Sequence, residues 1–207
     1  MITELDDEIP PPRQHPWTVV VSNPNLHYWD FKSQPEQIPN VLEDFKPWAH
    51  CEAIQRFYEL LSWLNGADSV FESNDCGLRP PIVDHATPEP IRSAFGADPV
   101  VMHCRLTFIV RDLLWNCSKP TVDAIKIRML DALRENVPNI PAVVKVGEWA
   151  HFFTEVEKAG HAISLRIWAW GDDEAAAMRQ LGDVFEALHG CLRWMSDGIK
   201  AQVARAT

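Results

Sequence analysis

The pattern of apolar and polar positions is clearest between residues 162 and 195. Residues 162–170 alternate as side chains do on the two faces of a β-strand. One face is apolar and the other carries an arginine and two tryptophans: Ile163, Leu165, Ile167 and Ala169 against Ser164, Arg166, Trp168 and Trp170. After Gly171 the period becomes helical, with one apolar stripe: Leu181, Val184, Phe185, Leu188, Leu192 and Met195. We therefore expect a strand and then, with Asp172 as its N-cap, a long helix that shares a core with the strand.

Three further elements are expected before this pair: a strand over 100–110, a helix over 118–136 and a strand over 149–157. Ser118 suits a helix N-cap, and Gly160 suits a hairpin turn between the last two strands. The resulting order is strand, helix, strand, strand, helix. We therefore expect an α+β fold with a ferredoxin-like βαββα core over residues 100–197, an antiparallel sheet and helices on one face. A missing edge strand would come from Trp17–Val21 or Ala142–Val146.

The first half of the chain is less regular. Residues 1–16 are rich in acids and prolines, which predicts a flexible, extended arm before a single domain at 17–207. A helix is expected over 48–64, with Pro47 in its first turn and Asn65-Gly66 as its stop. Residues 73–99 contain five prolines, which exclude helix and interior strand, so a long irregular segment is expected there. In this reading, residues 17–99 cover a core half formed by residues 100–207.

Charge narrows the classes of partner. The net charge of the 207 residues is −10, and the excess of acids lies in residues 1–99, with 16 acidic against 6 basic side chains. Nucleic-acid binding depends on clustered Lys and Arg, so this balance disfavours it and favours a protein partner, possibly a basic one. Nine tryptophans against two tyrosines indicate large buried or contact areas per residue.

The cysteines and the N-terminus indicate a compartment. The five cysteines are scattered, without a C-x-x-C pair, which argues against a disulfide framework and a zinc ribbon. The opening MITELDDEIPPP is unlike a signal peptide, and no apolar run reaches the roughly 20 residues of a membrane span. We therefore expect a reducing, cytoplasmic setting without membrane contact, and no cofactor is indicated.

The polar face of the expected sheet is the first candidate site. It would present His103 and Arg105 beside Arg166, Trp168 and Trp170. Aromatic and arginine side chains dominate protein–protein hot spots, and on ferredoxin-like sheets they also stack RNA bases. The alternative is that the first hundred residues, above all the helix over 48–64, cover this face and bury the tryptophans.

A second candidate lies in the proline-rich segment. Cys76, flanked by Asp75 and followed by His85, has the residue types of a nucleophile, an orienting carboxylate and a base. Asn, Asp and Gly clusters are also ordinary turn residues, and no hydrolase signature surrounds them. The His-Cys pairs at 50–51 and 103–104 do not place two ligands on one face, so no metal site is expected.

These observations predict a non-catalytic interaction protein. An inhibitor, immunity or adaptor protein, or a subunit of a larger assembly, would bind its partner through an acidic, tryptophan-rich surface. One alternative is a small enzyme that uses Cys76 with His85, or His103 and Arg105, in a cleft under residues 73–99. A second alternative is single-stranded nucleic-acid binding on the sheet face.

Overall fold

A sheet lies at the centre of the computed structural model, which describes residues 1–16, 28–85, 88–95, 98–136 and 139–206. Its strands within these residues are β1 (Ile2–Leu5), β2 (Arg13–His15), β3 (Phe71–Val83), β4 (Val100–Val110), β5 (Ala142–Phe153) and β6 (Lys158–Gly171). The spatial order is β1-β5-β6-β4-β3, with β2 also beside β5. Neighbours are antiparallel, except that β1 and β2 run parallel to β5. The sheet is therefore open, mixed and mostly antiparallel.

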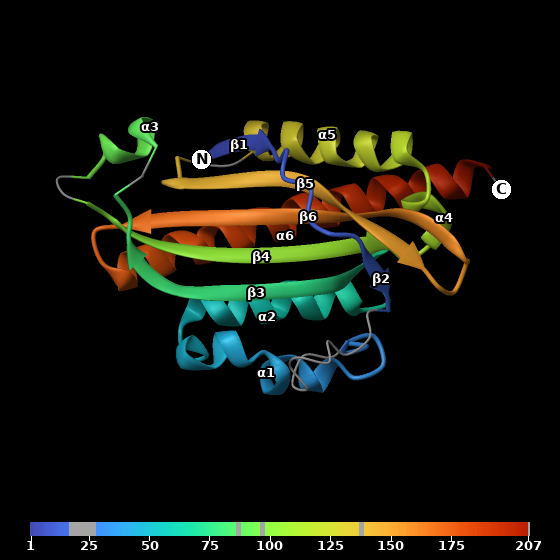
Figure 1. Cartoon of the computed structure of the whole chain (residues 1–207), viewed down its shortest axis with the longest axis horizontal. Coiled ribbons are helices and arrows are strands. Elements are labelled where there is room, and N and C mark those ends of the chain that lie inside the picture. The colour runs from blue at the N-terminus through green and yellow to red at the C-terminus, as the bar shows by residue number, and fades with distance from the viewer. Residues whose placement is uncertain (17–27, 86–87, 96–97, 137–138, 207) are drawn as a thin grey trace.

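The helices pack mainly behind this sheet. They are α1 (Ile38–Val41), α2 (Glu52–Asn65), α3 (Glu89–Arg92), α4 (Leu113–Asn116), α5 (Lys119–Asn136) and α6 (Glu174–Ala206), with 3-10 helices η1 (Pro35–Gln37) and η2 (Glu43–Trp48). Figure 1 shows α2, α5 and α6 on the far side of the strands, with α6 running along most of their length. The α+β class is confirmed.

The main core lies between these helices and one face of the sheet. The predicted inward face of β6 is completely buried there: Ile163, Leu165, Ile167 and Ala169. The apolar stripe of α6 packs against it, with Leu181, Val184 and Leu188 fully buried. The change from a period of two to a helical period after Gly171 therefore correctly predicted β6, α6 and the core that they share.

Gly171 is the last residue of β6 before the turn into α6, and no residue larger than glycine fits there. A Cβ on Gly171 would lie 2.2 Å from the backbone nitrogen of Ala177. The helix cap differs from the prediction by one residue, because the carboxylate of Asp173, not Asp172, accepts a hydrogen bond from the Ala176 N–H at 2.7 Å. The helix thus folds back onto the sheet directly after the strand.

The prediction of an irregular segment over 73–99 was wrong for its first part, since β3 runs to Val83. Pro80 and Pro81 are tolerated because β3 is an edge strand and its register with β4 shifts between Arg79 and Ile82. β3 therefore forms the edge strand beside β4. The predicted sources of a missing edge strand were residues 17–21 and 142–146. Residues 142–146 instead begin β5, and residues 17–21 lie outside the described residues.

The helix predicted over 48–64 is α2, which begins later than expected. Pro47 lies inside the 3-10 helix η2, and the α-helical turns start only after Cys51. α2 approaches α6 closely, since a Cβ on Gly182 would meet the Cβ of Ala53 at 3.0 Å. This helix therefore lies on the core side of the sheet, and the alternative in which it covers the polar face is wrong.

The hairpin of β5 and β6 turns earlier than predicted. The turn occupies residues 154–157, where Glu157 has a positive φ of 52°, and β6 has already begun at Lys158. Gly160 lies within the strand, and a Cβ there would meet the backbone oxygen of Asn116 at 2.5 Å. The glycine thus allows a close approach of α4 rather than a chain reversal.

The N-terminal arm is attached to the sheet. β1 pairs with Val143–Val146 of β5 and β2 pairs with His151–Phe153, while residues 6–12 pass in front of the strands (Figure 1). No helix among the described residues has the length and apolar character needed to cross a membrane.

Candidate functional site

One end of the sheet's outer face is covered by the segment around α3. Ile91 packs there with Val101, Val143 and Trp170 in a small core of its own. Trp170 is only 3% exposed, and its indole Nε1 donates to Asp84 Oδ2 at 2.8 Å. Trp170, predicted as a partner-binding residue, is therefore covered by residues from the first half of the chain.

The opposite end is closed by β5, which curves over the face toward β3. Asn74 of β3 bridges two histidines: its Oδ1 accepts from His15 Nδ1 and its Nδ2 donates to His151 Nε2, both at 2.8 Å. The Nδ1–H of His151 donates to the Trp149 carbonyl, also at 2.8 Å. These hydrogen bonds fit a neutral His151, and burial lowers its pKa to about 4. β3 and β5 are thus tied together although two strands separate them in the sheet.

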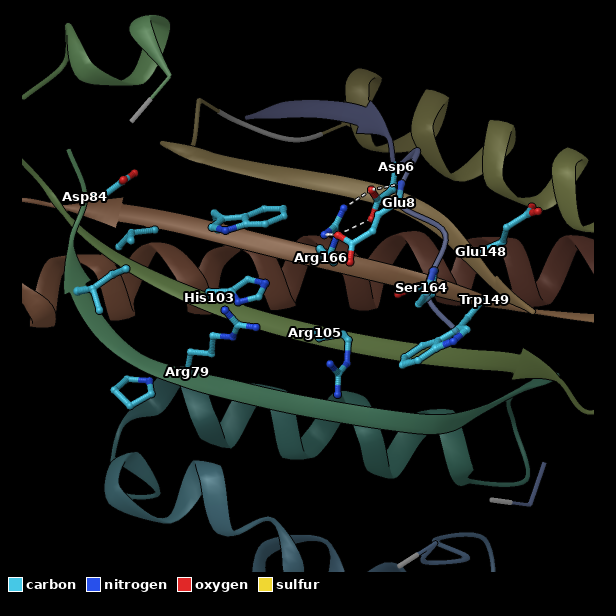
Figure 2. A pocket seen from close by; sticks show the side chains of 15 residues that line it. Asp6, Glu8, Arg79, Asp84, His103, Arg105, Glu148, Trp149, Ser164 and Arg166 are labelled. Atoms are coloured by element: carbon cyan, nitrogen blue, oxygen red, sulfur yellow. Dashed lines mark hydrogen bonds and ion pairs between the residues drawn. The ribbon is translucent and has the colours of Figure 1, made fainter. Parts of the chain in front are cut away.

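Between these two covered ends lies an open basin of about 730 Å³. Its floor comes from β3, β4 and β6, and its rim comes from β5 and the N-terminal arm. Figure 2 shows Arg79, His103 and Arg105 extending from β3 and β4, with Arg166 beneath Asp6 and Glu8 of the arm. Four of the five predicted partner-binding residues line the basin: His103, Arg105, Arg166 and Trp168.

An aromatic pair forms one part of the floor. His103 stacks on Trp168 with ring centroids 4.8 Å apart and an interplanar angle of 17°. Burial, with smaller contributions from Arg79 and Arg105, lowers the pKa of His103 to about 4, so its ring is neutral at pH 7. Its buried Nε2 has no hydrogen-bond partner among the described residues.

Cations form a row across three adjacent strands. Arg105 of β4, Arg166 of β6 and Lys145 of β5 are direct cross-strand neighbours. Like charges in such positions repel each other, so each requires compensation. Asp75 pairs with Arg105 at 2.9 Å, Glu4 pairs with Lys145 at 3.3 Å, and Asp6 and Glu8 of the arm both bind Arg166.

The sequence pattern did not reveal several lining residues. The face of Trp149 carries the Arg13 guanidinium 3.8 Å from its ring centroid, and its Nε1 donates to the Pro11 carbonyl at 2.5 Å. Alternation counted from Val143 would have placed Trp149 on this face, but the strand was predicted to begin only at residue 149. Arg79 was missed because β3 was not predicted, and it has no ion-pair partner among the described residues.

The second candidate site is not assembled. Cys76 packs against the main core, and burial raises the pKa of its thiol well above the ordinary value. Asp75 points to the other face of β3, where it binds Arg13 and Arg105. His85 is exposed beyond the end of β3 and pairs with Asp98 at 2.8 Å. The three residues therefore do not form a nucleophile, base and orienting carboxylate.

Among the described residues, no group of three or more His, Cys, Asp or Glu side chains is placed to hold a metal ion. No family model, curated protein or solved structure matches this chain.

Proposed function

We propose that the chain is a non-catalytic interaction protein of the inhibitor, immunity or adaptor type, or a subunit of a larger assembly, and that the basin is its contact surface. The observation that carries this proposal is the half-buried Trp168–His103 stack in an open concave face, beside Arg79, which has no ion-pair partner among the described residues. Tryptophan and arginine in a partly desolvated centre are typical of interface hot spots.

The earlier proposal of a basic partner rests on the net charge alone. The basin lends it no support, because its floor presents arginines. The proposed contact surface is therefore narrower than the acidic, tryptophan-rich surface expected from the sequence. It consists of His103, Arg105, Arg166 and Trp168, together with Arg79 and Trp149. Trp170 is left out because it is buried.

The enzyme alternative has weaker support. A buried thiol with a raised pKa is a poor nucleophile, which disfavours Cys76. His103 and Arg105 do share the basin, but a histidine with a pKa of about 4 is a weak general base at neutral pH.

Nucleic-acid binding also has weaker support. Base stacking needs an open aromatic face, whereas Trp168 has His103 stacked on it and the cations of Lys145 and Arg166 within 6.0 Å of its ring centroid.

A cytoplasmic location remains a prediction from the cysteine pattern.

We also propose the ferredoxin-like description for residues 100–197. Its support is the antiparallel order β5-β6-β4 together with α5 after β4 and α6 after β6. β3, which precedes this unit in the chain, would supply the fourth strand.

The proposed contact surface is tested by differential capture. The immobilised full chain, its Trp168→Ala variant and its Trp194→Ala variant are each exposed to a lysate of the host cell. Trp194 is the matched control, since it is 55% exposed on α6, outside the basin. We expect a protein that is retained by the wild type and by Trp194→Ala but lost, by about tenfold or more, with Trp168→Ala. Equal retention by all three, with the fold intact by circular dichroism, would contradict the proposal.

A further inference from the structure

Part of the rim of the basin is a peptide segment, namely the chain's own N-terminal arm, which reaches Arg166 on the floor. Residues 4–11 are extended, acidic and then proline-rich (ELDDEIPP). Both carboxylate oxygens of Asp6 accept hydrogen bonds from the guanidinium of Arg166, and the Asp6 side chain is only 6% exposed. Its backbone N–H donates to the Val146 carbonyl at 2.9 Å. Recognition therefore uses side chain and backbone together, as in the binding of an extended peptide.

Gly147 makes room for the side chain of Asp6. A Cβ on Gly147 would lie 2.7 Å from the Cβ of Asp6, closer than real side-chain contacts allow. Two residues farther along β5, Trp149 donates its indole N–H to the carbonyl of Pro11. Arg166 and Gly147 thus accommodate the acidic side chain of Asp6, and Trp149 binds the backbone of the proline segment that follows it in the arm.

The arm is held at few points between its two strands. Ile9 is 90% exposed, and Glu8 is mostly exposed although it reaches Arg166. Arg79 and the Nε of Arg105 have no partner among the described residues even with the arm in place. The basin therefore holds more cationic donors than the arm satisfies.

On the basis of the proposed function, we propose that the partner presents an extended acidic, proline-containing segment that binds across Arg79, Arg105 and Arg166. Residues 4–11 occupy the same seat as an internal competitor. A partner segment enters when its carboxylates replace those of Asp6 and Glu8 on Arg166. The ion pairs exchange one for one, so the row of cations is neutralised in both states.

The test uses a dye-labelled peptide with the sequence of residues 1–12 as the probe. In the full chain carrying Asp6→Asn and Glu8→Gln, the arm loses the two carboxylates that bind Arg166, while the receptor residues remain. We expect this variant to bind the probe at least about tenfold more tightly than the wild type in fluorescence anisotropy, since the internal competitor is weakened. A control peptide with the same two substitutions should bind neither protein. Equal affinity of the two proteins for the probe would overturn the proposal.

Gly147→Ala, added to the double variant, separates a shaped seat from general attraction between charges. It retains every charge but places a methyl group where the side chain at position 6 of the arm begins. Probe affinity should fall by about tenfold or more, and it should also fall when Arg166→Gln is added instead. If Arg166→Gln weakens binding of the probe but Gly147→Ala does not, the probe does not bind in the site beside Gly147. Its binding is then a nonspecific attraction between charges.

Two further results distinguish this inference from the proposed function. If Trp168→Ala abolishes partner capture but no variant binds the probe, the contact surface stands and the acidic ligand is wrong. If the wild type forms a dimer that the probe dissociates in size-exclusion chromatography, the arm binds a second copy of the chain and a separate partner class is overturned. Probe binding by a monomeric double variant supports the inference whatever protein the lysate yields.

Discussion

On the helix side of β6, Leu165 and Ile167 lie in one continuous apolar core, whereas on the other side Arg166 and Trp168 lie among charges and rings. The first face is closed by long helices. The second is closed in patches by segments that are distant in sequence, and one basin stays open between them. The regular alternation of apolar residues in β6 therefore identifies the face that stabilises the fold. The structure of the opposite face depends on contacts between segments that are distant in the sequence.

The largest expected effect tests the helix side. Leu165→Ala should lower the free energy of unfolding by about 4 kcal/mol, because it removes a fully buried side chain and leaves a cavity. Leu5→Ala is the matched control, since Leu5 is mostly exposed and should change the free energy of unfolding by less than about 0.5 kcal/mol. Urea unfolding of both variants measures this, and comparable losses would remove the distinction between the two environments.

A smaller effect should divide the outer face itself. Trp170→Ala should cost about 3 kcal/mol, because Trp170 is buried under α3 and its indole is hydrogen-bonded. Trp168→Ala should cost about 1 kcal/mol, mainly the loss of the stack with His103. Thermal unfolding of the two variants checks this order. A larger loss for Trp168→Ala would mean that the basin residue, and not Trp170, belongs to the core.

A pH-dependent effect, smaller than that of Trp170→Ala, concerns the closed end near β2. His151 has a folded-state pKa of about 4, below its ordinary value of 6.5, so protons bind more readily to the unfolded chain. Stability contributed by neutral His151 is therefore complete above pH 6.5 and is lost as the pH falls toward 4, by about 2 kcal/mol. Arg13 and His15 add to the unfavourable charge, while Asp75 opposes it.

Urea unfolding at pH 7 and pH 4.5 measures this dependence. The His151→Gln variant should lose less stability between these two values than the wild type does, since it has no imidazole to protonate at this position. The same pH dependence in both proteins would show that other buried groups account for the loss.

The sequence sufficed for the parts of the fold that depend on local period. β4, α5, β6 and α6 follow from alternation, helical spacing and glycine or proline stops, and so does the buried face of the sheet. The edge strand β3 was missed because its prolines are compatible with a strand only at an edge, and edge position is a property of the assembled sheet.

The candidate site was predicted in part for the same reason. His103, Arg105, Arg166 and Trp168 lie on regular strands, so alternation placed them on one face. The burial of Trp170 depends on Asp84 and α3, which no period reveals. The seat of Asp6 at Gly147 joins positions 141 residues apart in the chain, and only the folded sheet brings them together.

The proline pair of β3 has a consequence beyond the pairing of one strand. An exposed sheet edge is a template onto which another chain can add, and such additions lead to aggregates. Pro80 and Pro81 lack N–H groups and lie where the register with β4 shifts, so this edge offers an interrupted row of donors. At the opposite edge, β1 is only four residues long. Both margins of the sheet thus discourage growth by strand addition, which suits a protein that exposes a basin on its face.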